Sequence, residues 1–446
     1  MTHPIPLSAR RTPSRSGRWS LAATASALVA LGAPLEARPQ SAAPGAQGTP
    51  GETGSPAQES SFLDGLEGLE PALRGGDFWL SMRYRFEAVD QDGFAREGRA
   101  STMRTHIGYQ TAPWHDFVGL VELENVSDIG ADDKHNNRKN QEFGRPVTAD
   151  APGSSVNQAY LEYGGAPGTT VRAGRQRITL DNERFIARRN WRQRQQVFDA
   201  ATASVDVTDD LHLFASWVGA TNTPFRTRSE TDGGIVNARY DIPGVGSVTG
   251  YWYYVDFAKR FLQQFSTSTI GARLTGSTDI GKELELRYTA EYASQADVGD
   301  NPNDVDADYL FGEIGLTSGP MRATLGQEVL GGSRRPGDRL TTPFGALHRH
   351  NGWADKFTFF PGVGLRDTYL EVGSSDGPMS WAVIAHDFRA DATSADLGWE
   401  LDLTFSYDVS ESASVALIVA DYHGKDAIAP SLVDTTKVFL LLSLWI

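Results

Sequence analysis

The residues of this sequence whose types and spacing could do chemistry are arginines. The stretch RAGRQRITLDNERFIARRNWRQRQQVFDA, residues 172–200, contains eight of them, although the chain has a formal net charge of −15. Between residues 172 and 194 these eight cations meet only Asp181 and Glu183, so the local balance is +6. Arginine keeps its charge at physiological pH, and its planar donors pair with carboxylates in bidentate fashion. The stretch therefore indicates a site for anions. Acidic residues elsewhere do not conflict with this, because salt screens charges beyond about 8 Å.

The elements that must position these arginines are predicted to be β-strands. Apolar and polar residues alternate with a period of two in residues 78–87, 283–292 and 397–409. This period places alternate side chains on opposite faces of a strand. Each run has about ten residues, the length that a tilted strand needs to cross a bilayer. One face is rich in Tyr, Trp and Phe, as in an aromatic girdle, and the other carries Arg, Glu, Asp and Thr, as in a wet lumen.

This alternation predicts an all-β protein, an antiparallel outer-membrane β-barrel of about eighteen strands. A soluble β-sandwich or propeller would also alternate, but its polar face would point outward and its inner face would favour Val, Ile and Leu. The strands are expected to begin near residues 78, 101, 117, 155, 169, 200, 211, 234, 246, 264, 283, 307, 321, 364, 379, 397, 413 and 435.

The N-terminus has the composition of an export signal. Four arginines up to Arg18 precede a short apolar run at residues 20–33, which is too short for an ordinary spanning helix. We therefore expect a signal peptide over 1–37, with cleavage near Ala43 as an alternative. A flexible Pro/Gly/Ala-rich periplasmic linker is expected over 38–76, and the barrel over 77–446. The chain has no cysteine, which excludes a lipoprotein anchor and a disulfide framework.

Three long links follow odd-numbered strands and are therefore expected to be extracellular: 127–153, 180–196 and 331–362. In the arginine-rich stretch the alternation fails after Ile178 and returns near Val197. Charge lies on every face in between, which excludes contact with lipid, where a midplane arginine costs about 2–4 kcal/mol. The segment must either lie in the outside water or fold into the lumen.

Several motifs resemble the bacterial alginate export family of outer-membrane proteins. They are GRQRITLDNERF (174–185), WRQRQQVFDA (191–200), TTPFGALHRHNGWADKF (341–357), GLRDTYLEVG (364–373) and the opening strand SMRYRFEAVDQDGF (81–94). The resemblance covers roughly residues 77–446. It implies an eighteen-stranded barrel with a constricted, electropositive pore.

The functional interpretation is a channel, not an enzyme, that passes an anionic polysaccharide or oligosaccharide such as an alginate-like polyuronate. An uptake porin for small carboxylates, sugars or other anions is the alternative, and an outer-membrane barrel enzyme such as a lipase or protease is a weaker one. Individual arginines could instead brace the barrel by pairing with Asp181, Glu183, Asp199 or carboxylates of the lumen. The expected pore-lining residues are Arg172, Arg175, Arg177, Arg184, Arg192 and Arg194, extended along the wall by Arg83, Arg85 and Arg104.

Motifs for other chemistry are weaker. Residues 373–377 fit the G-x-S-x-G nucleophile pattern but are expected to form a tight turn between strands. His348 and His350, with Asp355 nearby, could ligate a metal, but we expect them to bind loop backbone. The acidic run 297–308 lacks the glycine spacing of an EF-hand. No cofactor, metal or nucleic acid is expected. The expected partners are the anionic cargo, outer-membrane lipid and periplasmic secretion or polymer-processing proteins.

Overall fold

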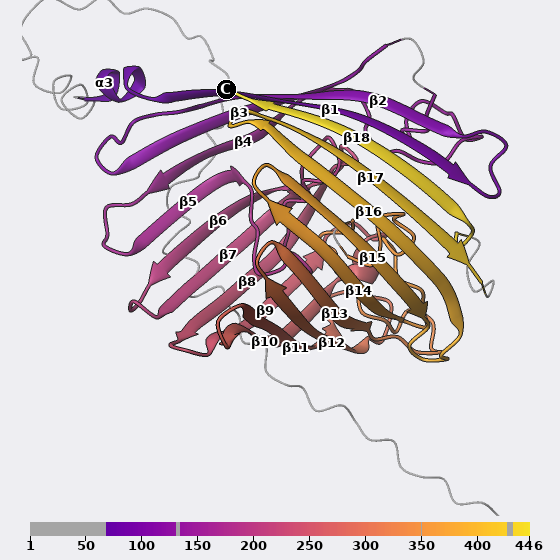
Figure 1. Ribbon diagram of the computed structural model, residues 1–446. Helices are drawn as coiled ribbons and strands as arrows, with labels where there is room; N and C mark the ends of the chain where they lie inside the picture. Colours follow the sequence, from indigo (N-terminus) through magenta and orange to yellow (C-terminus); the bar gives the residue numbers. More distant parts are fainter. Residues whose placement is uncertain (1–67, 131–133, 349, 426–430) are drawn as a thin grey trace, which may run out of the picture. The chain divides into compact units, whose positions relative to one another are not determined.

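The computed structural model describes residues 68–130, 134–348, 350–425 and 431–446 (Figure 1). The expected signal peptide and residues 38–67 of the expected linker lie outside the described residues. The last part of that linker contains a short helix, α3 (Leu69–Arg74), and the first strand begins at Asp77. None of the helices in the described part of the chain has the length and apolar character needed to cross a membrane.

The described chain forms a closed barrel of eighteen antiparallel strands, as predicted. The first strand pairs with both the second and the last, so the sheet closes on itself. The strands are β1 (Asp77–Gln91), β2 (Gly98–Gln110), β3 (Phe117–Asp128), β4 (Gly153–Tyr163), β5 (Thr169–Gln176), β6 (Val197–Asp206), β7 (Leu211–Asn222), β8 (Arg228–Ile242), β9 (Gly246–Phe257), β10 (Thr267–Ile280), β11 (Leu284–Asp297), β12 (Asp306–Ser318), β13 (Met321–Leu330), β14 (Leu365–Asp376), β15 (Met379–Arg389), β16 (Asp396–Ser410), β17 (Ala413–Gly424) and β18 (Thr435–Trp445). A single 3-10 turn, η1 (Gln263–Phe265), lies between β9 and β10.

The largest difference from the expected strand starts is at β8, which begins at Arg228 instead of near residue 234. Its first residues, RSETD, are polar on both faces, so they show no apolar alternation. They pair with the end of β7 beyond a register shift between Val218 and Ala220. Strand pairing thus extends this strand past the point where the hydrophobic pattern stops.

The two faces of the strands follow the predicted alternation. In β16, Trp399, Leu401 and Leu403 are exposed on the outside, whereas Glu400 and Asp402 point inward and are fully buried. Large apolar side chains exposed in a continuous band are unfavourable in water, and they match the lipid-facing band of a membrane barrel. The polar side chains are therefore concentrated in the lumen.

Two long links fold into the lumen. For residues 180–196 this decides between the two positions that the sequence allowed, whereas residues 331–362 were expected to be extracellular and instead fold back against the inner wall. We call residues 177–196, between β5 and β6, the first inward loop, and residues 331–364, between β13 and β14, the second inward loop. Arg83 on the inner face of β1 donates to the carbonyl of Asn190, 2.8 Å away. Arg184 pairs with Glu328 on β13. Both loops follow odd-numbered strands, so they enter the barrel from the same end.

We expect the second inward loop to be reachable from outside the cell at its exposed tip. Because the chain has no cysteine, Arg334→Cys, at an exposed position, should be labelled by an impermeant maleimide on intact cells. Asp338→Cys should react poorly, because Asp338 is buried and accepts hydrogen bonds from Arg335 and the backbone N–H of Asp306. Asp376→Cys, at the opposite end of the barrel, should react only after lysis. The reverse pattern for Arg334 and Asp376 would show that the expected orientation is inverted.

Candidate functional site: a cation-lined cavity in the lumen

The two inward loops are joined directly to each other. The backbone N–H of Ala187 donates to the carbonyl of Phe344 (2.9 Å), and that of Ala346 donates to the carbonyl of Glu183 (2.8 Å). The side chain of Gln196 donates to the carbonyl of Phe344 as well. At Gly345, a Cβ atom would lie 1.9 Å from the carbonyl oxygen of Arg184, so this close approach requires glycine. The loops therefore act as one packed unit inside the barrel.

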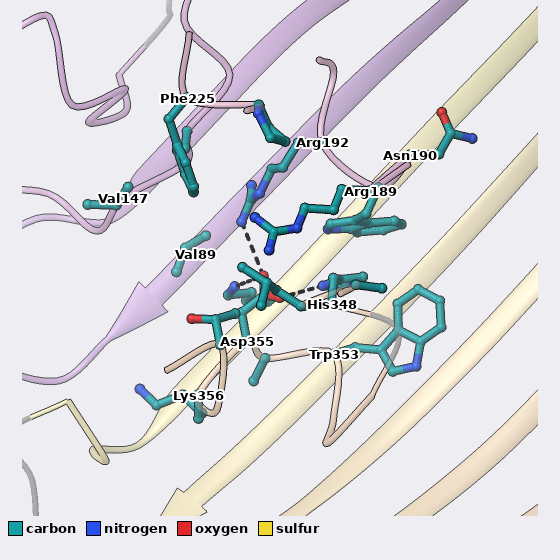
Figure 2. Close-up of a pocket in the computed structure, with 18 of the residues that line it drawn as sticks. Val89, Val147, Arg189, Asn190, Arg192, Phe225, His348, Trp353, Asp355 and Lys356 are labelled. Carbon is teal, nitrogen blue, oxygen red and sulfur yellow. Dashed lines mark hydrogen bonds and ion pairs between the residues drawn. The ribbon is translucent and has the colours of Figure 1, made fainter. Parts of the chain in front are cut away.

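One carboxylate, that of Asp355, ties this unit to the wall. It accepts from Arg192 of the first loop (3.1 Å), from His348 of its own loop (2.5 Å) and from Lys437 on β18 (2.7 Å) (Figure 2). The ring of His348 stacks on Trp191, with centroids 3.7 Å apart. Burial lowers the pKa of His348 to about 4, against the attraction of Asp355, so this histidine is neutral at pH 7. Asp355 therefore has two full cations as partners.

Most of the predicted pore-lining arginines are paired with carboxylates. Arg184 is almost fully buried against Glu328, and Asn351 also contacts it. Arg85 pairs with Glu87 at 2.6 Å, and both are completely buried. The remaining pairs are Arg172 with Glu162, Arg177 with Glu122, Arg192 with Glu87 and Asp355, and Arg194 with Glu124. These contacts match the bracing role that the sequence left open for individual arginines.

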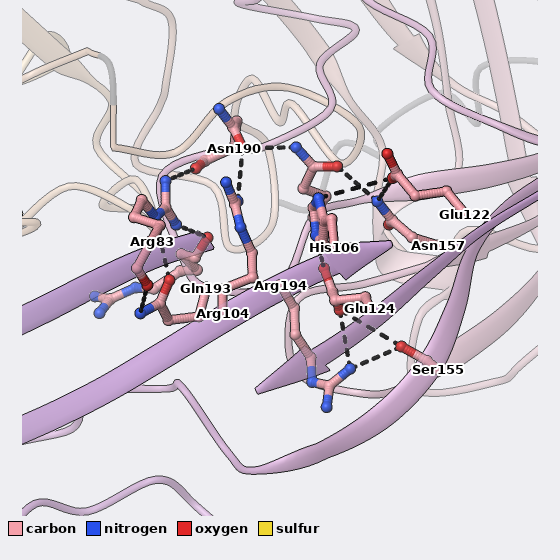
Figure 3. Close-up of polar contacts among 12 residues, drawn as sticks. Arg83, Arg104, His106, Glu122, Glu124, Ser155, Asn157, Asn190, Gln193 and Arg194 are labelled. Atoms are coloured by element: carbon pink, nitrogen blue, oxygen red, sulfur yellow. Dashed lines mark hydrogen bonds and ion pairs between the residues drawn. The ribbon is translucent and has the colours of Figure 1, made fainter. Parts of the chain in front are cut away.

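The inner faces of β1 and β2 hold the first inward loop against the wall (Figure 3). Arg83 donates to Gln193 and to three backbone carbonyls of residues 190–192. Arg104 donates to the side chain of Asn190 at 3.0 Å. Neither arginine forms an ion pair within the described residues. Both guanidinium groups are therefore held by neutral oxygens, and carboxylates such as Glu124 and Asp150 act on them without forming a contact ion pair.

Arg175 lies on the other side of the wall. It shares a face of β5 with Val171 and Ala173, and the strand partner of Ala173 is Leu161, which is half exposed on the outer surface. Arg175 pairs there with Asp199, at 2.7 Å. The alternation that places Val171 and Ala173 outward applies to Arg175 as well.

The main cavity of the lumen, about 670 Å³, lies beside the inward loops. Along β18 its lining includes Lys437, Leu441 and Ser443, which span roughly 20 Å at about 3.3 Å per residue. Its charged lining residues are seven cations and two carboxylates. The cations are Arg83, Arg138, Arg188, Arg189, Arg192, Lys356 and Lys437, and the carboxylates are Glu183 and Asp355.

Five of these seven cations have no ion pair within the described part of the chain. Besides Arg83, Arg189 donates to the carbonyls of Gly345 and Pro343, and Lys356 donates to the hydroxyl of Thr435. Arg138 lies over the ring of Phe225, 4.9 Å from its centroid. Arg188 makes no side-chain hydrogen bond or ion pair with another described residue.

Burial shifts the pKa values of two of these cations. It lowers the pKa of Arg189 to about 10, so Arg189 stays charged at pH 7. Burial, together with repulsion from Lys437, lowers the pKa of Lys356 to about 8. Lys356 therefore loses its charge as pH rises through about 8.

Sequence reasoning counted Arg188 and Arg189 in the cationic stretch but did not select them as site residues. Distance along the chain from an acidic residue would not have separated them, because the paired Arg192 and Arg194 also lie five or more residues from Glu183 and Asp199. Arg138, Lys356 and Lys437 were missed because they come from other links and from β18. Only the fold brings them to the cavity.

The other candidate motifs are accounted for by local structure. Residues 373–377 run from the end of β14 into the turn before β15, without a helix. No group of three or more metal-ligating side chains that could hold an ion occurs among the described residues. His348 instead binds Asp355.

Comparison with known proteins supports the family and the fold. The alginate export family model matches residues 76–230, which confirms the predicted resemblance there. OccAB4 of Acinetobacter baumannii has a similar structure (TM-score 0.63, 12% identity, 83% of this chain and 98% of that one). So has OpdL of Pseudomonas aeruginosa (TM-score 0.63, 14% identity, 84% and 99%). These are outer-membrane barrel proteins. No curated protein sequence matches the chain significantly.

The buried pair of Arg184 and Glu328 should stabilise the inward loops. Arg184→Met leaves the carboxylate of Glu328 buried without its cation, which typically costs about 3–5 kcal/mol. We expect the heat-modifiable gel shift of the barrel, or protease protection of the loops, to be lost at lower temperature. Arg188→Met makes the same change to an arginine without a carboxylate partner and should have little effect. Equal effects of the two substitutions would contradict this assignment.

Proposed function

We propose, on the premise that residues 76–230 belong to the alginate export family, that this outer-membrane channel passes anionic polysaccharide or oligosaccharide chains through the cation-lined cavity. The observation that supports this most is the excess of seven cations over two carboxylates in the cavity lining. Uronate chains carry one carboxylate per sugar, so successive sugars would meet successive cations.

The cavity cations that form no ion pair within the described part of the chain are the ones available to bind an anionic cargo. An arginine that already holds a carboxylate offers little further attraction, whereas Arg188 and Arg189 form no ion pair with any residue that the structure describes. Burying a cation without a partner is costly, and sites that keep such groups are often functional. In a narrow passage with low-dielectric walls the field of these groups is focused on the water inside.

The distribution of charge within the lumen favours one path for anions. A second cavity, of about 310 Å³, is lined by the carboxylates Glu313, Glu328, Asp367 and Glu371 and by one arginine, Arg273. Arg184 and Arg322 pair with Glu328 and Glu371, and His386 contacts Asp367, so this lining has no excess of cations. An anion would avoid that side and follow the wall of β17, β18 and β1. Several weak contacts along this path would allow cargo to enter and leave, as conduction requires.

Uptake of small carboxylates is the second candidate. A volume of about 670 Å³ lies in the range of sites for small ligands. Block of the current by alginate oligomers that increases with chain length would favour the polymer. Equal block by monomeric and oligomeric uronates, at equal carboxylate concentration, would favour small carboxylates.

The cations of the cavity should make the pore anion-selective. We expect Arg138→Glu combined with Arg188→Glu to shift the reversal potential under a KCl gradient toward cation selectivity. The double variant Arg260→Glu, Arg334→Glu makes the same change in charge at two exposed positions outside the cavity lining. It should leave the reversal potential nearly unchanged. A cation-selective wild-type pore would refute the proposal.

Selectivity should also depend on pH through Lys356. This lysine is charged below its pKa of about 8 and neutral above it. Raising the pH from 7 to about 9.5 should therefore weaken anion selectivity in planar-bilayer recordings. In Lys356→Arg, which stays charged over this range, most of that pH dependence should disappear. A pH dependence that survives this substitution would assign the titration to another group.

A further inference from the structure

The cavity has an apolar side as well as a cationic one. Three phenylalanines line it, each from a different link: Phe94 after β1, Phe225 after β7 and Phe359 in the second inward loop. Val89 and Val147 lie on the same side of the view as Phe225, whereas Arg189 lies nearer the centre (Figure 2). The apolar lining is therefore built from several segments that are distant in the sequence.

These three aromatic side chains are not fully buried. The side chain of Phe359 is 60% exposed, and Phe94 and Phe225 are partly exposed. An aromatic ring left in contact with water loses the hydrophobic free energy that burial would supply. A barrel lumen could bury these rings under its loops, as it does for Phe344 and Phe357. Their exposure therefore leaves apolar surface free for a ligand.

The three phenylalanines line the same cavity as the cations that form no ion pair with a described residue. The guanidinium of Arg138 lies over the ring of Phe225. Phe359 is three residues from Lys356, and both line the cavity with Arg188 and Arg189. A ligand at this place would meet aromatic faces and carboxylate-binding cations together. Gln91, Asn190 and Thr358 add neutral polar groups to the same lining.

We propose that this part of the cavity, the ring site (Phe94, Phe225 and Phe359 with Arg138, Arg188 and Lys356), binds carboxylates carried on a six-membered ring with an apolar face. The ring covers the phenylalanines while its carboxylate pairs with a cation. An acyclic acid of the same charge reaches the cations but covers less aromatic surface. Pyranose uronates and aromatic acids share this chemistry. The inference rests on the proposed function, because it names the cargo class of the same cavity.

The test compares ring and chain acids of equal charge as blockers of the chloride current through the full-length refolded protein. Galacturonate and gluconate are both six-carbon monoanions, but galacturonate is predominantly a pyranose ring and gluconate is acyclic. We expect galacturonate to block at roughly two- to tenfold lower concentration, the range that aromatic ring contacts contribute. Benzoate against hexanoate forms a second pair. A ring preference for galacturonate alone would identify a sugar site, and one for benzoate alone an aromatic-acid site.

Substitutions of the phenylalanines test whether these residues cause the preference for ring acids over chain acids. Phe94→Ala, Phe225→Ala and Phe359→Ala together should abolish the difference between ring and chain acids, because they weaken galacturonate block more than gluconate block. The single change Phe359→Ala, at an exposed position, should reduce the difference even if the triple variant folds poorly. The matched control is Phe143→Ala with Phe261→Ala, two phenylalanines that are 73% and 69% exposed but lie outside the cavity lining. It should behave as wild type.

The outcomes separate this inference from the proposed function. An anion-selective wild-type pore that galacturonate and gluconate block equally, with benzoate and hexanoate also equal, would overturn the ring site alone. So would a ring preference that persists in Phe359→Ala and in the triple variant. A cation-selective wild-type pore would overturn the proposed function, whatever the block by ring acids.

Discussion

The interior of this barrel depends on one carboxylate shared by three donors. Asp355 binds Arg192, His348 and Lys437, which belong to the first inward loop, the second inward loop and the wall. The carboxylate of Asp355 therefore fixes the two inward loops and the wall relative to one another. Burial keeps His348 neutral, and the positive charges of Lys437 and Arg192 beside it add to this effect. Without this junction the two loops would still pack on each other, and their contacts with β18 would be reduced to the hydrogen bond from Lys356 to Thr435 and the packing of Trp191 and His348 on Phe439.

The arginines of the lumen divide into two groups by their partners. Those with carboxylates, such as Arg184 and Arg194, are buried and support the loops. Those without, such as Arg188 and Arg189, line the cavity, where the paired Arg192 also lies. A buried ion pair contributes little net charge to its surroundings, whereas a cation held by carbonyl oxygens keeps its full field. The same residue type thus serves as a brace in one place and as a binding group in another.

Much of the fold could be predicted from the sequence, because a strand that faces lipid on one side and water on the other must alternate. The alternation gave the strand number, the faces of β1 and β16, and the positions of the long links. It could not show where β8 begins, since its polar first residues carry no pattern.

The site was less accessible to sequence reasoning. Ion pairing depends on partners such as Glu328, which is 144 residues from Arg184. The local sequence therefore could not distinguish a paired arginine from an unpaired one. Arg175 is the exception, because the parity of β5 already places it outward, with Val171 and Ala173.

The long separation between the two inward loops has a consequence for biogenesis. Arg189 binds the carbonyl of Gly345, 156 residues further along the chain. Contacts over such distances form late, because the intervening chain must first be ordered. The first loop cannot dock until β13 and β14 are in place. A barrel that closes before this docking would be a wide, leaky hole in the membrane. We therefore expect assembly to bring the second loop into the lumen before β18 closes on β1, so that the passage is narrowed before the membrane is breached.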